Sequence, residues 1–269
     1  MRYFPTVCPR KNICGLEYTL RVRPRFYVPG LDATAARVSL PDDEAEHLVR
    51  VLRLATGAEV EVFDGRGGLW RAEVIESGKR SASIHAIEAI AAAPEVAVPL
   101  TLVISILKAD KMDDVVRDAV MLGVTGIWPV VSDRSEISLS TVAKSQRVAR
   151  WQRIAVSSTK QCGRAVVPVV APAQGLASYL NEPTSSVRLL CIEPVGPPLM
   201  GGRVLPVQAV GKPESAHVIV GPEGGWAPAE LSAAFAAGVV PVSLGGRTLR
   251  ADAAPLVALT ALLTTWSEL

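Results

Sequence analysis

Two glycine-rich segments near the C-terminal end of the chain could bring a flat polar ligand against the backbone. They are Gly221-Pro222-Glu223-Gly224-Gly225 and Leu244-Gly245-Gly246-Arg247-Thr248-Leu249-Arg250. Glycine has no Cβ atom, so a ligand can lie directly on the peptide N–H and C=O groups of such a segment. A single Gly-Gly pair is more often a tight structural turn. The two segments together favour a ligand site.

The surrounding pattern predicts where the two segments lie. Each follows an apolar run typical of a buried strand, at residues 218–220 and 239–243, and each precedes a helix-like stretch, at residues 228–237 and 255–266. Open α/β sheets bind their ligands beyond the carboxyl ends of parallel strands. We therefore expect both segments at the same edge of one parallel sheet.

The rest of the chain divides into two patterns. Residues 25–93 alternate apolar and polar positions in short runs that predict a small β-barrel, with strands over 25–28, 59–65, 69–75 and 82–87 and a helix over 42–52 that Asp42 caps. After a linker at residues 91–94, buried strands alternate with helices, which predicts an α/β domain with a parallel sheet covered on both faces. Its further elements are strands over 100–107, 126–131 and 187–192 and helices over 110–122 and 142–162. The predicted units are an extension over 1–22, expected to be disordered, a barrel over 23–93 and the α/β domain over 97–269.

Composition and missing motifs exclude several classes of protein. The chain has no G-x-G-x-x-G after an early strand, no phosphate-binding P-loop and no G-x-S-x-G elbow. No apolar run reaches the roughly 18 residues that span a bilayer. Three histidines and four cysteines without paired spacing predict no metal site. Free thiols and no secretory signal predict a cytoplasmic protein.

The formal net charge of +2 conceals an uneven distribution, because residues 137–181 contain no acidic side chain. On a helix, Arg150, Arg153, Lys160 and Arg164 share one face. Like charges at this spacing repel one another, which favours a polyanionic partner such as RNA. A merely solvated basic face is the alternative.

Taken together, several motifs resemble those of a known family. They are Arg25-Phe26-Tyr27-Val28, His47-Leu48-Val49-Arg50-Val51-Leu52-Arg53, Lys108-Ala109-Asp110-Lys111-Met112, Leu122-Gly123-Val124, Ser132-Asp133-Arg134-Ser135, Arg150-Trp151-Gln152-Arg153-Ile154, Gln161-Cys162-Gly163-Arg164 and the two glycine-rich segments. The chain resembles the bacterial 16S ribosomal RNA (uracil-1498-N3) methyltransferase family, in the SPOUT class of trefoil-knotted methyltransferases. The resemblance covers nearly everything from residue 25 to residue 266. It differs at Arg250-Ala251-Asp252-Ala253-Ala254, where the family usually has R-x-E-T-A, and at Ser157-Ser158-Thr159-Lys160, where the family usually has acidic residues.

The resemblance implies a fold, partners and site residues. The fold would be a PUA-like RNA-binding barrel followed by a knotted SPOUT domain, in a homodimer that uses S-adenosyl-L-methionine and acts on 16S rRNA of the 30S ribosomal subunit. The implied cofactor-binding residues are Ile192, Glu193, Gly221, Pro222, Glu223, Gly224, Gly225, Leu244, Gly245, Arg247, Leu249 and Ala254. The candidate RNA-binding residues are Arg25, Arg50, Arg53, Lys108, Lys111, Arg134, Arg150, Arg153, Gln161 and Arg164.

Methylation of uracil N3 needs a proton acceptor and a donor to the flanking oxygens. Arg250 and Arg247 are the cations beside the glycine-rich segments, and Arg250 is the candidate catalytic donor. The candidate bases are Glu223 and Asp252. Asp252 is equally well explained as the N-cap of the last helix, and Glu223 as a partner of loop amides.

Three functions remain open from the sequence. The first is methyl transfer to rRNA, and the second is RNA binding without catalysis on the same fold. The third is a nucleotide-binding enzyme, which is disfavoured because Trp226 follows the first glycine segment where a phosphate loop would have Lys, Ser or Thr. The last helix is apolar on nearly every side, which predicts that a second subunit covers part of it.

Overall fold

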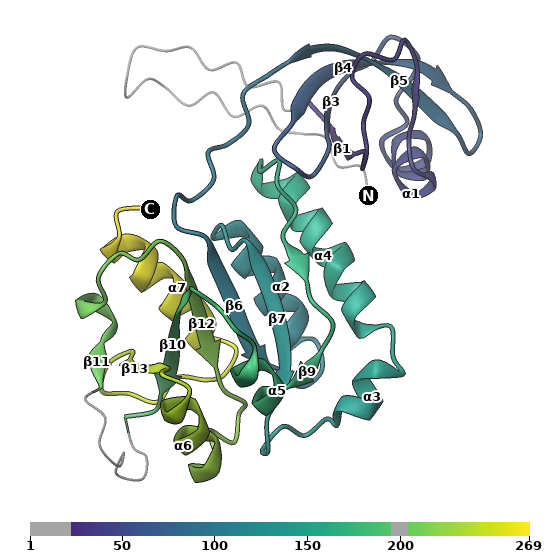
Figure 1. Ribbon diagram of the computed structural model, residues 1–269. Coiled ribbons are helices and arrows are strands. Elements are labelled where there is room, and N and C mark those ends of the chain that lie inside the picture. Colours follow the sequence, from purple (N-terminus) through teal and green to yellow (C-terminus); the bar gives the residue numbers. More distant parts are fainter. Residues whose placement is uncertain (1–22, 195–203) are drawn as a thin grey trace.

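The computed structural model describes residues 23–194 and 204–269 and contains two β-sheets (Figure 1). The first sheet curls into the small barrel-like part, with strand order β1-β3-β4-β5-β2. Its strands are β1 (Arg25–Tyr27), β2 (Val38–Ser39), β3 (Glu59–Phe63), β4 (Leu69–Ser77) and β5 (Ala82–Ala89). Alternate residues of these strands point inward, so that Phe26, Val60, Val62 and Ile84 are completely buried. The structure therefore confirms the predicted small β-barrel.

The helix of the barrel differs from the prediction in its cap. Helix α1 (Asp42–Glu46) continues directly into a π-helical turn (His47–Leu52), which together match the predicted range. Asp42 lies inside the helix, and the residue before the first turn is Pro41, which offers no side-chain acceptor. The prediction that Asp42 caps this helix is therefore wrong. Its carboxylate still lies favourably in the first turn of the helix, together with Asp43 and Glu44.

The second sheet is parallel throughout, as predicted. Its strand order is β11-β13-β10-β12-β6-β7-β8, and β9 also pairs with β7. The strands are β6 (Leu100–Ser105), β7 (Gly126–Val131), β8 (Val169–Val170), β9 (Gln174–Gly175), β10 (Val187–Ile192), β11 (Leu205–Pro206), β12 (Ala216–Val220) and β13 (Val240–Ser243). Strands β10, β12 and β6 lie at its centre, where both faces are covered, which explains their continuous apolar sequences.

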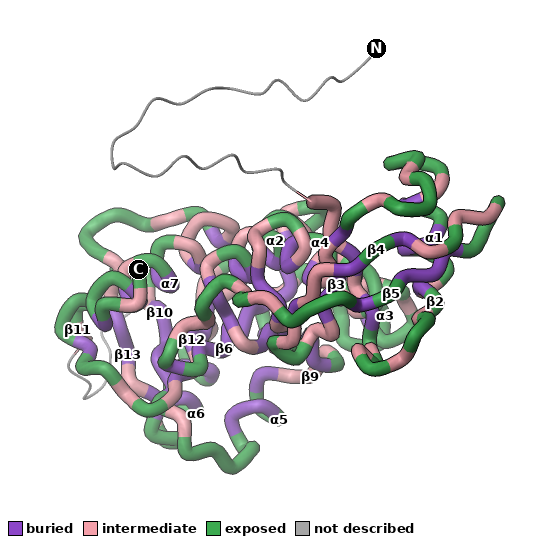
Figure 2. The backbone as a smooth tube through the Cα atoms, turned by 90° about the horizontal axis from the view of Figure 1, so that it is seen from above, coloured by how far each residue is buried: buried purple, intermediate pink, exposed green. Residues whose placement is uncertain are grey.

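Helices cover both faces of this sheet (Figures 1 and 2). The helices are α2 (Lys111–Met121), α4 (Arg147–Cys162), α5 (Leu176–Asn181), α6 (Pro228–Ala236) and α7 (Ala254–Thr265), and a 3-10 turn spans Val207–Ala209. Neighbouring residues of β6 belong to two different cores: Leu102 to the core beneath α2, α4 and α7, and Val103 to the core beneath α5 and α6.

The predicted helix over residues 142–162 is two helices. Ser138 caps a short α3 (Leu139–Ala143) by accepting a bond from the Thr141 N–H. The hydroxyl of Ser145 then donates to the carbonyl of Val142 at 2.7 Å, and α4 begins two residues later. Serine hydroxyls compete with helical backbone bonds in this way, and the basic periodicity of the segment did not reveal the break.

Two expectations concern residues outside the described ranges. The extension over 1–22, with Cys8 and Cys14, lies there completely. The chain between β10 and β11 includes residues 195–203, so the knot that the resemblance implies stays a prediction. Within the described residues, no helix is both long and apolar enough to cross a membrane.

Candidate functional site

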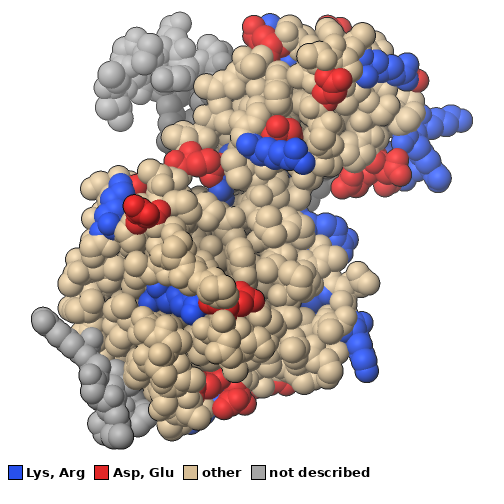
Figure 3. Space-filling model, viewed as in Figure 1, with Lys and Arg blue, Asp and Glu red and all other residues tan. Residues whose placement is uncertain are grey.

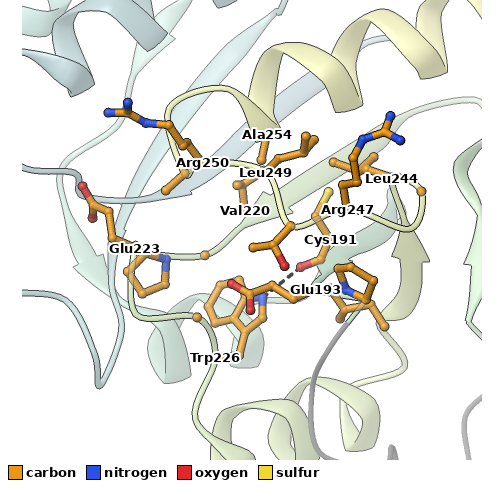
Figure 4. Close-up of a pocket in the computed structure, with 18 of the residues that line it drawn as sticks. Cys191, Glu193, Val220, Glu223, Trp226, Leu244, Arg247, Leu249, Arg250 and Ala254 are labelled. Atoms are coloured by element: carbon orange, nitrogen blue, oxygen red, sulfur yellow. Dashed lines mark hydrogen bonds between the residues drawn. The ribbon is translucent and has the colours of Figure 1, made fainter.

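Both glycine-rich segments line one pocket at the carboxyl edge of the parallel sheet (Figure 4). The loops that follow β10, β12 and β13 form its walls, and the start of α7 closes one side. Its volume is about 320 Å³, which lies within the range of pockets that bind small organic ligands. The expectation that the two segments share one sheet edge is confirmed.

Most of the predicted cofactor-binding residues line this pocket. They are Ile192, Glu193, Gly221, Pro222, Glu223, Gly225, Leu244, Gly245, Arg247, Leu249 and Ala254, and the predicted catalytic Arg250 lines it as well. Sequence reasoning missed several further lining residues: Cys191, Pro194, Val220, Trp226, Thr248 and Ala251. Lys111, which was assigned to RNA, also lines the pocket. Most of these residues are close in sequence to the glycine-rich segments, and this proximity could have been used to predict them.

Gly224 is the exception among the predicted cofactor residues. It does not line the pocket, and a Cβ atom at this position would lie 3.1 Å from the Cβ of Arg134. The Arg134 guanidinium donates to the carbonyl of Gly224 at 2.9 Å. The missing side chain of Gly224 thus makes room for the loop that carries Arg134, and its contact with the cofactor stays a prediction.

Two other glycines have backbone conformations that side chains rarely adopt. The φ angle is +67° at Gly225 and +110° at Gly245. A Cβ at Gly225 would lie 3.3 Å from the carboxylate of Glu193, whereas nothing lies within 4 Å of one at Gly245. Gly225 therefore allows both a tight turn and a close approach, and Gly245 is required by its backbone conformation alone.

Trp226 fixes the floor of the pocket. Its indole N–H donates to the carbonyl of Cys191 at 2.9 Å, and a Cβ at Gly221 would lie 2.9 Å from its ring. Trp226 thus joins the loop after β12 to the end of β10. Burial raises the pKa of the Cys191 thiol to about 12, so the thiol stays neutral. Figure 4 shows the carboxylate of Glu193 beside the Trp226 ring.

Charged side chains flank one side of the pocket, where Arg250 and Glu223 reach outward together (Figure 4). The ammonium of Lys111 lies 3.1 Å from the Glu223 carboxylate. Partial burial alone would raise the pKa of Glu223, but its backbone N–H and Lys111 outweigh burial, and the pKa lies below its ordinary value. Glu223 is therefore ionised at neutral pH. Its carboxylate accepts a hydrogen bond from the Lys111 ammonium, and the expected bonding to neighbouring loop amides stays a prediction.

Asp252 is not the N-cap of the last helix. That position belongs to Ala253, and no side chain caps α7. Asp252 lies outside the pocket lining, and its Oδ1 is 3.3 Å from the Nε of Arg250 without hydrogen-bond geometry. The same oxygen is buried and has no hydrogen-bond partner among the described residues. The prediction that Asp252 caps the last helix is therefore wrong. Its carboxylate lies beside the guanidinium of Arg250.

The predicted basic face of α4 is divided between two environments. Just after the C-terminal end of the helix, Arg164 is buried and binds the carboxylate of Glu95, and it also donates to the carbonyls of Val120 and Val124. Lys160 binds Glu44 of the barrel at 2.7 Å. Both side chains were expected on an exposed RNA-binding face, and this expectation is corrected.

Arg25 is another predicted RNA-binding residue with an internal role. Its guanidinium donates to the carbonyl of Arg164 at 2.9 Å and to that of Lys160 at 3.2 Å, and it lies 3.3 Å from Glu61. A cation at the last carbonyls of a helix also interacts favourably with the helix dipole. What we call the domain joint consists of Arg25, Lys160 and Arg164 with Glu44, Glu61 and Glu95. Arg25 and Lys160 link the barrel to the end of α4, and Arg164 links the segment after α4 to Glu95, which follows the barrel.

The remaining candidates for RNA binding lie at the surface. Arg50, Arg53, Lys108, Arg134, Arg150, Arg153 and Gln161 are exposed. Several are already paired: Arg50 with Glu46, Lys108 with Glu136 and Arg150 with Asp113. Figure 3 accordingly shows blue and red side chains interspersed, rather than one continuous basic field on this face. The acid-free stretch receives its acidic partners from other segments.

No group of three or more potential metal ligands is found among residues 23–194 and 204–269.

Comparisons with known proteins agree with this architecture. Residues 94–263 match the model of an RNA methyltransferase domain, and residues 40–87 match that of an RNA methyltransferase PUA domain. The ribosomal RNA small subunit methyltransferase E of Synechocystis sp. is 34% identical over 230 residues, which are 83% of this chain and 72% of that protein. The crystal structure of a ribosomal RNA small subunit methyltransferase E from Neisseria gonorrhoeae bound to S-adenosyl methionine superimposes with a TM-score of 0.80 at 34% identity, over 91% of this chain and 98% of that one. A putative methyltransferase from Legionella pneumophila, in complex with the same cofactor, gives a TM-score of 0.79 at 25% identity, over 91% and 98%.

A PUA-type barrel joined to a parallel sheet with a glycine-lined pocket at its carboxyl edge defines an RNA methyltransferase of the SPOUT class. Within this class, the chain belongs to the ribosomal RNA small subunit methyltransferase E family.

Proposed function

We propose that this protein transfers a methyl group from S-adenosyl-L-methionine to N3 of a uridine in the 16S rRNA of the small ribosomal subunit. The observation that carries the proposal is the single pocket that both glycine-rich loops form at the carboxyl edge of the sheet. The family membership supports the rRNA substrate. The cytoplasm, as the place where this RNA would be met, stays a prediction.

The pocket fits this cofactor in size and in chemistry. Cys191, Val220, Leu244, Leu249 and Ala254 supply an apolar wall for a flat base. The backbone at the glycines is open to polar edges, and the carboxylate of Glu193 offers an acceptor for hydroxyl or ammonium groups. When bound, the cofactor supplies an electrophilic methyl group on a sulfonium.

The chain must hold the uracil in line with this methyl group and accommodate the charge that develops on the uracil oxygens. Arg250 is suited to this task, because its side chain is 75% exposed and lies at the pocket rim. We propose that its guanidinium donates to a uracil oxygen and that Asp252, 3.3 Å from its Nε, orients it.

Two carboxylates are candidates for removing the N3 proton. Glu223 lies in the pocket but is held ionised with a pKa below its ordinary value, which makes it a weaker base. Asp252 lies outside the lining but has an oxygen without a hydrogen-bond partner among the described residues. Rate–pH profiles of Glu223→Gln and Asp252→Asn separate them, since only loss of the base removes the dependence of the rate on its ionisation.

The RNA would be held by the exposed candidates of the barrel, the pocket surroundings and α4, together with the half-buried Lys111. The exposed ones are Arg50, Arg53, Lys108, Arg134, Arg150, Arg153 and Gln161. Arg25 and Arg164 are proposed to act on RNA only indirectly, through the domain joint that sets the position of the barrel.

We propose a homodimer as the active form. On α7, the apolar side chain of Val257 is 40% exposed, near the loop that carries Arg250, whereas Leu259, Leu262 and Leu263 are buried within the chain. An exposed apolar side chain at this position is suited to a contact across a two-fold axis. Sedimentation of the active protein as a monomer would contradict this part of the proposal.

The test of the proposed reaction is mass mapping of methyl groups in small-subunit RNA after incubation with the protein and S-adenosyl-L-methionine. We expect one added methyl group on a uracil base. Calorimetry with this cofactor and with ATP is the companion measurement, because an RNA-binding protein without catalysis would bind neither. A nucleotide-binding enzyme would prefer ATP.

A further inference from the structure

The loop after β7, residues 132–135, stands at the outer side of the first glycine loop. The hydroxyl of Ser132 lies 3.1 Å from that of Ser105 and 2.9 Å from that of Ser135. Ser105 and Ser132 are buried at the ends of β6 and β7, which places this chain of hydroxyls inside the sheet edge. One side of the loop is therefore anchored to the sheet.

The other side of the loop is anchored by Glu230. One oxygen of its carboxylate accepts from the backbone N–H of Asp133 at 2.8 Å, and the other accepts from the N–H of Ala227 at 2.9 Å. Glu230 is only 9% exposed, so both bonds are shielded from water. A single side chain thus bridges the 132–135 loop and the loop that carries the glycines.

The bridge is more than a helix cap. Glu230 is the third residue of α6, where a glutamate returns to the amide before the helix in a capping box. The residue at the cap is Ala227, which has no side-chain acceptor, so only the glutamate half of that motif exists. The bond to Asp133, which is 97 residues away in the chain, is not explained by capping.

What the bridge holds in place is Arg134. This side chain is exposed, and it uses one amino group to bond the carbonyl of Gly224. The guanidinium has five N–H donors, and the others are directed away from that bond. We infer that Glu230 is a positioning residue that holds Arg134 beside the first glycine loop, so that Arg134 can bind a phosphate of the RNA substrate.

This inference rests on the proposed function, because it names a determinant of RNA binding at the same site. Substitution Glu230→Gln tests it. The amide oxygen can keep the local bond to the N–H of Ala227, but its NH₂ group then faces the N–H of Asp133, so the 132–135 loop must move. We expect the KM for RNA to rise about tenfold, as for the loss of one bond to a charged group, with kcat and the affinity for S-adenosyl-L-methionine within about twofold of wild type.

A second variant separates positioning from capping. Ala227→Ser adds the missing cap acceptor, because the backbone at this position has the extended conformation of an N-cap. In the double variant Ala227→Ser/Glu230→Gln we expect the melting temperature to recover while the RNA defect remains. Recovery of the KM for RNA together with the melting temperature would reduce Glu230 to a helix cap and overturn the inference.

Two controls complete the experiment. Ser232→Ala changes a hydroxyl on the same helix that bonds only the carbonyl of Pro228, and it should leave both KM values unchanged. The double variant Arg134→Ala/Glu230→Gln should raise the KM for RNA no more than Arg134→Ala alone does, since both substitutions act through the Arg134 side chain. Additive losses would overturn the inference.

RNA affinity is measured by filter binding as well as by methyl transfer. If the wild-type protein binds ribosomal RNA but does not methylate it, the proposed function fails while the role of Glu230 is still decided by the binding data.

Discussion

The domain joint and the pocket rim both contain arginines beside carboxylates, yet the two regions differ in what surrounds the charges. In the joint, Arg164 has a side chain that is 6% exposed and bonds Glu95 and two carbonyls. At the rim, Arg250 is 75% exposed, and its ion pair among the described residues is with Asp252. An arginine whose donors are all used by the protein stabilises the fold, whereas one with free donors is available to a ligand.

This difference also explains why the two regions have different backbones. The joint uses the carbonyls at the C-terminal end of α4, which Arg25 satisfies. The rim uses loops in which Gly225 and Gly245 adopt positive φ angles. The first arrangement fixes two parts of the protein relative to one another, and the second leaves backbone groups open to a substrate.

The largest effect on stability is expected from Arg164→Ala. The substitution leaves Glu95 and the carbonyls of Val120 and Val124 without their donor. We expect a loss of about 3 kcal/mol, at the low end for a broken buried pair because Glu95 is partly exposed. In a chain of this size that corresponds to a fall of roughly 5–6 °C in melting temperature.

The exposed Arg153 is the matched control for Arg164, since it lies on α4, just before Arg164 in the chain, and bonds only a carbonyl one turn earlier. Arg153→Ala should change stability by less than about 0.5 kcal/mol. It should instead reduce the salt dependence of RNA binding. Equal melting temperatures for the two variants would remove the distinction between the joint and the exposed part of α4.

The next effect concerns the rim. Arg250→Ala should lower kcat by about 10²–10³-fold, the usual scale for one donor that stabilises developing charge. Its melting temperature should stay close to that of wild type, because the side chain is exposed. Single-turnover methylation of small-subunit RNA and a thermal melt measure the two quantities. Turnover near that of wild type would take Arg250 out of the reaction.

Gly245→Val tests the backbone of the second loop. Nothing within 4 Å opposes a Cβ here, but a β-branched residue at a φ of +110° is strained. We expect a loss of about 1–3 kcal/mol and weaker binding of S-adenosyl-L-methionine by calorimetry. Gly246→Val is the control, because its φ is not positive and nothing lies within 4 Å of its added Cβ either. Equal affinities in both variants would mean that the conformation of Gly245 does not shape the pocket.

The contrast between the two regions also separates what the sequence predicts from what it does not. The buried strands β7 and β10 were predicted to the residue, because a parallel sheet needs continuous apolar runs. The two glycine loops were placed at one edge by the same reasoning. The role of Arg164 was not predicted, because helical periodicity reveals which residues share a face but not that Glu95 arrives there from another segment.

Within the site, errors came from contacts between segments far apart in the chain. Nothing in the sequence indicated that the loop of Arg134 lies beside Gly224. Asp252 had the spacing of a cap before Pro255, yet Ala253 takes that position and Asp252 lies beside Arg250. Local sequence rules cannot decide between two acceptable local roles when a tertiary neighbour determines the outcome.

The smallest predicted effect comes from His217, a half-buried histidine of β12 that contacts Tyr179 of α5. The Nδ1 of His217 lies 2.8 Å from the hydroxyl of Tyr179. Burial lowers the pKa of His217, the cation of Arg188 lowers it further, and Glu182 opposes them. The unfolded chain, in which a histidine has a pKa near 6.5, therefore binds this proton more readily than the folded protein does. Stability should be constant above about pH 6.5 and should fall as the pH decreases toward the lower folded-state pKa.

Urea unfolding across this pH range measures the effect. His217→Gln should flatten the decrease, because glutamine keeps an acceptor for Tyr179 but does not titrate. His85→Gln is the control, since His85 lies exposed on β5 and should leave the pH dependence of wild type unchanged. A stability that increases on acidification, and does so less in His217→Gln, would mean that the protonated imidazole is favoured in the fold. In that case burial and the nearby Arg188 cation would not determine the pKa of His217.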